Sequence, residues 1–185
     1  MKPKLFAVLL GGKPEGWTIE THNMFFGVDS NPEGEGLYPA IKRFWPAPPR
    51  IHIDAYTIIE RIGNVRITPV RMNDPVSSEG DLRLFFVNLG GYRAEVHEEF
   101  HKKLFIVARN EAHAKEIAKR DPFFTEYDVS PHVDDTQALD EFGDEPPIDV
   151  NALVEPQGFR LVLKRIRSSR LVYPKPSFIG YRKIP

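Results

Sequence analysis

The chain has 185 residues, a formal net charge of −1, 41% hydrophobic and 28% charged residues, and no cysteine. This composition is that of a folded protein with one ordinary domain or two small ones. The lack of cysteine excludes disulfides, thiolate nucleophiles, iron–sulfur clusters and cysteine-ligated zinc. A charge so close to zero provides no general attraction to nucleic acid or to an anionic membrane.

The first part of the chain recurs in its second half. Residues 5–12 read LFAVLLGG, and residues 84–91, which lie 79 positions later, read LFFVNLGG. Ten of the 24 positions from 5 to 28 are identical at this offset, where chance predicts about one or two identities. We therefore expect two copies of one module.

The first module is predicted to open with a strand over residues 5–10, because apolar side chains alternate there. The pair Gly11 and Gly12 is expected to end that strand in a tight turn. A second strand is predicted at residues 18–28 and a short helix near 37–43. A β-branched strand at 55–62 and a closing strand at 65–70 complete the module.

The second module is predicted to repeat these elements. A strand is expected at residues 96–108, and a helix at 110–120 that Asn110 caps. The closing strand is expected at residues 159–164, where the offset between the copies has grown to 94. About 14 extra residues therefore lie in the second copy, and we assign them to an acidic insertion near residues 143–156.

The predicted fold is of the α+β class, with two tandem β-β-α-β-β repeats, largely antiparallel sheets and a pseudo-two-fold axis between the repeats. The expected boundaries are residues 1–72 for the first module, 73–80 for a linker, and 81–170 for the second module. Residues 171–185 are either an extended strap that packs by its aromatic rings or a disordered tail.

Four of the six histidines occupy equivalent positions in the two copies, and each has a carboxylate two residues away. The candidate ligand-binding residues are Glu20, His22, His52, Asp54, Glu99, His101, His132 and Asp134. Residues two apart in a strand share a face, so each module is expected to gather two imidazoles and two carboxylates if the two strands are neighbours. Three interpretations remain: a structural ion pair, a site for a ligand or partner, and a metal or proton-transfer site.

Residues 97–101 read HEEFH and so match the zinc-protease pattern H-E-x-x-H. That pattern requires a helix that places both histidines on one face. The segment that follows, residues 102–107, is predicted to be a strand, which argues against a metalloprotease. Neither glycine pair belongs to a phosphate-binding motif.

The order LFxVxLGG, then E-x-H before an apolar strand, then H-x-D before a β-rich closing pair, resembles the bacterial domain of unknown function 1543. The chain looks like a member with two tandem copies of that domain. The resemblance implies a bacterial, cytoplasmic protein, and it implies no reaction because the family is uncharacterised.

We expect an uncharacterised protein that serves as a non-catalytic module for binding a small ligand or a protein. The alternative is a metal-dependent, hydrolase-like enzyme that uses the repeated His, Glu and Asp residues. Its cofactor would be a divalent metal. We expect no nucleic acid partner and no membrane association, a cytoplasmic location, and a monomer or a homodimer.

Overall fold

The structure is a computed structural model that describes all residues except 1, 77–79, 93–94, 127–128, 134–146 and 168–170. It is a mixed α+β fold, and each strand pairing in the described residues is antiparallel. The chain divides into two compact units, Met1–Ser78 with Leu153–Pro185, and Glu79–Ala152. Within the described residues, no helix combines the length and the apolar character needed to cross a membrane.

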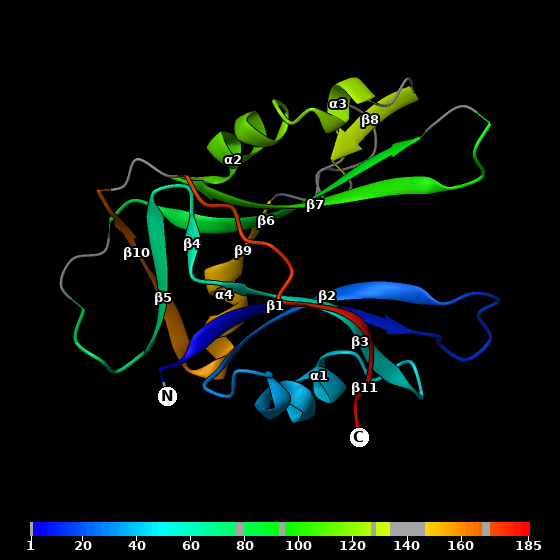
Figure 1. The fold of residues 1–185 in the computed structure, drawn as a ribbon, viewed down its shortest axis with the longest axis horizontal. Helices are drawn as coiled ribbons and strands as arrows, with labels where there is room; N and C mark the ends of the chain where they lie inside the picture. The colour runs from blue at the N-terminus through cyan, green and yellow to red at the C-terminus, as the bar shows by residue number, and fades with distance from the viewer. Residues whose placement is uncertain (1, 77–79, 93–94, 127–128, 134–146, 168–170) are drawn as a thin grey trace. The chain divides into compact units, whose positions relative to one another are not determined.

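The first unit contains a four-stranded sheet with β1 (Lys4–Gly12) and β3 (Ile51–Ile59) at its centre. The edges are β2 (Thr21–Asp29) and β11 (Phe178–Lys183), so the strand order is β11-β3-β1-β2 (Figure 1). Both glycines of the first pair lie inside β1, so the prediction that they form a turn is wrong.

One face of this sheet is covered by a 3₁₀ turn, η1 (Glu35–Leu37), and by the helix α1 (Tyr38–Phe44), which confirms the short helix expected near residues 37–43 (Figure 1). Leu37 and Ile41 pack there against Phe6 and other apolar side chains of the sheet. Because side chains alternate along a strand, residues such as Gly11 project from the opposite face of β1.

A second sheet of the first unit has the order β10-β5-β4. The hairpin of β4 (Arg61–Ile62) and β5 (Val65–Arg71) forms where the sequence predicts a turn and a closing strand. The strand β10 (Phe159–Arg165) is the closing strand expected for the second module, but it pairs with β5 over its full length. The middle pair of this ladder joins Thr68 to Val162. These two residues are 94 positions apart, so they occupy equivalent positions in the two sequence copies.

The second unit has β6 (Arg83–Tyr92) at its centre, between β7 (Glu99–Ala108) and β8 (Val129–Val133). The short strand β9 (Ile148–Asp149) also pairs with β6. The strands β8 and β9 hold the pairing positions that the single strand β3 holds in the first unit.

The inserted residues of the second copy can be located from these pairings. His132 pairs with Gly90 as His52 pairs with Gly11, which is an offset of 80 between the histidines. Ile148 pairs with Phe86 as Thr57 pairs with Ala7. The offset between the corresponding residues Thr57 and Ile148 is therefore 91. The offset between the copies therefore grows between His132 and Ile148.

The helix α2 (Glu111–Ala118) forms within the range predicted for it. Asn110 caps it by accepting a hydrogen bond of 2.9 Å from the backbone N–H of His113. Ala114 and Ala118 face the sheet and are fully buried in the core of the second unit. The short helix α3 (Phe123–Glu126) follows, and α4 (Val150–Val154) and the 3₁₀ turn η2 (Glu155–Gln157) precede β10.

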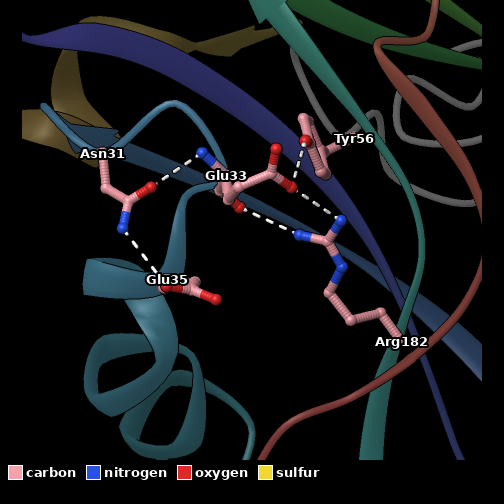
Figure 2. A network of polar contacts seen from close by, with 5 residues as sticks. All are labelled: Asn31, Glu33, Glu35, Tyr56 and Arg182. Atoms are coloured by element: carbon pink, nitrogen blue, oxygen red, sulfur yellow. Dashed lines mark hydrogen bonds and ion pairs between the residues drawn. The ribbon is translucent and has the colours of Figure 1, made fainter.

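A polar network holds β11 in the first unit (Figure 2). The guanidinium of Arg182 donates to the carboxylate of Glu33 at 2.9 Å and to its backbone carbonyl at 3.1 Å. The same guanidinium lies 4.4 Å from the ring centre of Phe178 and 5.4 Å from that of Tyr56. Burial lowers the pKa of Arg182, but the hydrogen bond with Glu33 and the nearby tyrosines outweigh burial and raise the pKa above its usual value.

Candidate functional site

The candidate site of the first unit is centred on Gly11. Gly11 of β1 pairs with His22 of β2 on one side and with His52 of β3 on the other. The two histidines therefore flank a residue that has no side chain. A Cβ added at Gly11 would lie 2.4 Å from His52 Nε2, 2.6 Å from Asp54 Oδ2 and 2.7 Å from Glu20 Oε1. The glycine therefore leaves the space that the polar side chains occupy, which explains why a glycine stands inside a strand.

Asp54 reaches this space through an irregularity of β3. Leu9 pairs with Ala55 and Leu10 pairs with Ile53, so Asp54 is an extra residue in the ladder between them. Such a bulge changes the direction in which a side chain projects, and bulges are frequent beside functional sites. Beside this bulge, the Asp54 carboxylate lies 3.1 Å from His52 Nε2.

Glu20 immediately precedes β2 and extends over β1 towards β3. Its Oε1 lies 3.0 Å from His52 Nε2 and 3.9 Å from His22 Nε2. His22 Nε2 is also 3.4 Å from Asp54 Oδ2. The ligand atoms of Glu20, His22 and Asp54 all lie within 4.8 Å of one another, and His52 adjoins this group through both carboxylates. The four residues expected to converge in the first module therefore do so.

The four side chains differ in their exposure. His52 is 5% exposed, and the ring of Tyr181 stacks on it with a distance of 4.2 Å between ring centres. Asp54 is partly buried, whereas Glu20 and His22 are open to solvent. Oδ2 of Asp54 is buried and accepts no hydrogen bond from the described residues.

The charges in the cluster are not matched by the hydrogen-bond donors available. Two carboxylates approach the same His52 Nε2, at 3.0 and 3.1 Å, and an imidazole nitrogen carries at most one hydrogen. The ion pairs that the described residues form with Glu20 and Asp54 at this site involve only the two histidines. The arrangement is thus suited to a positively charged group that would contact both carboxylates.

The second unit repeats part of this arrangement. Gly90 of β6 pairs with His101 of β7 and with His132 of β8, just as Gly11 pairs with His22 and His52 in the first unit. His101 Nε2 lies 3.8 Å from Glu99 Oε2, and its Nδ1 lies 3.3 Å from the side-chain amide of Asn88. Asp134 lies outside the described residues.

The HEEFH string does not lie on a helix. Residues 97 and 98 form a bend, and β7 begins at Glu99, so the two histidines cannot adopt the helical spacing of a zinc protease. The strand predicted after this string is confirmed.

Sequence reasoning missed two features of the site. The recurrence of the glycine pair could have revealed the role of Gly11, because a strand glycine that recurs beside paired histidines indicates a close approach. Tyr181 gave no such signal, because its contact with His52 depends on pairing between β11 and β3. Tyr181 also lines a groove of about 660 Å³ with basic and proline side chains, including Lys42, Arg50 and Lys183.

Residues 18–68 match the model of the Domain of Unknown Function DUF1543. A crystal structure of a protein Il1583 from Idiomarina loihiensis is similar in fold, with a TM-score of 0.62, 23% identity and 99% of each chain covered. No protein of curated function matches the chain significantly. The segment that carries Glu20, His22, His52 and Asp54 is thus similar to DUF1543, a family of unknown function.

Proposed function

We propose that the protein is a non-catalytic module for binding a small ligand, and that its first unit binds a positively charged group over Gly11. One observation supports this most directly: Glu20 and Asp54 converge on a single imidazole nitrogen, and the buried Asp54 Oδ2, 3.4 Å from His22 Nε2, accepts no hydrogen bond from the described residues. A buried carboxylate oxygen without a donor is costly, and a bound cation would remove that cost.

We propose that the chain holds two tandem copies related by a pseudo-two-fold axis, and that the second unit carries a related site. The equal pairing of Gly11 and Gly90 with histidines on both sides supports this. The ladder between β5 and β10 also supports it, because equivalent residues of the two copies, Thr68 and Val162, form its middle pair. An antiparallel pair centred on equivalent residues is the arrangement found across two-fold axes.

The proposed setting is the bacterial cytoplasm. The resemblance to a bacterial family supports it, and a chain without cysteine suits a reducing compartment. We propose a monomer or a homodimer, with a small molecule or a protein as its partner. The catalytic alternative finds no support in the comparisons.

The proposed function is tested by filling the space over Gly11. In Gly11→Ala, the new methyl group would overlap His52 Nε2 and both carboxylates. Thermal unfolding is followed with two cationic probes, zinc chloride and ethylenediammonium chloride. We expect at least one probe to raise the Tm of the unchanged protein by several degrees and to lose most of this effect in Gly11→Ala.

Gly80→Ala is the matched control, because a Cβ at Gly80 meets no atom within 4 Å. If Gly11→Ala does not fold, Glu20→Gln replaces it, because this exposed residue can lose its charge without a change of shape. The proposal fails if neither probe raises the Tm of the unchanged protein. It also fails if Gly11→Ala or Glu20→Gln responds as fully as Gly80→Ala does.

A further inference from the structure

We infer that the group bound over Gly11 is a divalent transition-metal ion, coordinated by Glu20, His22 and Asp54, with His52 beside both carboxylates; this inference rests on the proposed function. The site would take zinc or another metal that accepts both imidazole and carboxylate ligands.

The ligand atoms favour a transition metal over other cations. Calcium and magnesium bind mainly through oxygen, and an organic ammonium group needs only hydrogen-bond acceptors. Here each carboxylate faces an imidazole nitrogen: His52 Nε2 is 3.0 Å from Glu20, and His22 Nε2 is 3.4 Å from Asp54. The converging group of His22, Glu20 and Asp54 offers one imidazole nitrogen and two carboxylates, which zinc, iron(II), manganese and nickel accept.

The spacing of these atoms also fits a metal. In a tetrahedral site with bonds of about 2.0–2.1 Å, neighbouring ligand atoms are about 3.3–3.4 Å apart. His22 Nε2 lies 3.4 Å from Asp54 Oδ2 and 3.9 Å from Glu20 Oε1. The ligand atoms of Glu20, His22 and Asp54 all lie within 4.8 Å of one another, so side-chain movements would bring these three to bonding distance of one ion.

The surroundings position the ligands before binding. Tyr181 stacks on the buried His52 ring and limits its rotation. The bulge of β3 directs Asp54 towards Gly11, and the missing side chain of Gly11 leaves room beneath the ion. A metal site requires this fixed geometry, whereas an exposed ion pair does not.

The competing explanation is an ion pair between protonated histidines and carboxylates that has only a structural role. It predicts no metal affinity beyond that of scattered surface groups. The two explanations therefore differ in the number of ions bound and in their dependence on Glu20 and His22.

The test is a calorimetric titration of the full chain, prepared without a histidine tag and treated with a chelator, using zinc chloride and then manganese chloride. We expect tight binding of at least one zinc ion. In Glu20→Gln and in His22→Gln, we expect the number of tightly bound ions to fall by one, or the Kd of one site to rise about tenfold or more. Both residues are open to solvent, so the variants are expected to fold.

His97→Gln is the control, because it removes an imidazole outside the cluster, and its zinc binding should equal that of the unchanged protein. The inference is overturned if Glu20→Gln and His22→Gln bind zinc like the control. It is also overturned if ethylenediammonium raises the Tm but neither metal binds, in which case the proposed function stands. If no metal binds and ethylenediammonium has no effect, the inference and the proposed function both fail.

Discussion

At Gly11, the absence of a side chain leaves room for three polar groups that come from before β2 and from β3. The sequence predicted that Glu20, His22, His52 and Asp54 gather if their two strands are neighbours; they gather although β1 separates β2 from β3. It did not predict the bulge at Asp54, because a bulge depends on the pairing of two strands and has no local pattern here.

Asn110 offers a test of local structure in the second unit. Replacing Asn110 with alanine removes the acceptor for the N–H of His113, and we expect the free energy of unfolding to fall by about 1 kcal/mol. Urea denaturation measures the change. Asn110→Asp keeps the acceptor and should retain most of the stability, so equal losses in the two variants would contradict the capping role.

At the scale of elements, β11 connects the end of the chain to the candidate site. Its Phe178 ring stacks on Tyr56, and its Tyr181 ring stacks on His52. The sequence left residues 171–185 open between a packed strap and a disordered tail, because pairing with a strand more than 100 residues away leaves no trace in local composition. The helix α2 was easier to predict, because its cap and alanines lie within one short segment.

Tyr181 is expected to position His52 for the ligand. In Tyr181→Ala, we expect the zinc Kd of the first unit to rise about tenfold, because the imidazole loses the ring that limits its rotation. The free energy of unfolding should change little, because Tyr181 is 63% exposed. Tyr181→Phe keeps the ring and should bind zinc normally; equal affinity of Tyr181→Ala and Tyr181→Phe would show that stacking is irrelevant.

Arg182 is expected to hold β11 in place. In Arg182→Lys, the positive charge remains, but the paired hydrogen bonds to Glu33 and the flat contact with Phe178 are lost. We expect a loss of about 1 kcal/mol in the free energy of unfolding, measured by urea denaturation. Lys175→Ala, at an exposed position outside this network, should have no such effect. Equal stability of Arg182→Lys and the unchanged protein would contradict this role.

At the scale of the whole molecule, sequence similarity between the copies did not reveal how their strands are shared. The closing strands β5 and β10 were expected in separate modules, yet they pair with each other. Alternation of apolar residues indicates that a strand exists but does not specify its partner. The repeated pairing at Gly11 and Gly90 was implied by the repeat, because equal sequences favour equal registers.

The shared sheet makes a prediction about fragments. Residues 1–78 lack the strands β10 and β11 that complete the first unit, so we expect this fragment alone to show no cooperative thermal transition by circular dichroism. Coexpressed with residues 79–185, it should be recovered as a folded complex. A cooperative transition for residues 1–78 alone would contradict the requirement for β10 and β11.

The most direct test of the account is anomalous X-ray diffraction from crystals of the full chain soaked in zinc chloride, with data collected on both sides of the zinc absorption edge. We predict a zinc peak over Gly11, within about 2.0–2.2 Å of His22 Nε2 and of a carboxylate oxygen of Asp54. Zinc bound elsewhere in the crystal, with no peak among these side chains, would contradict it.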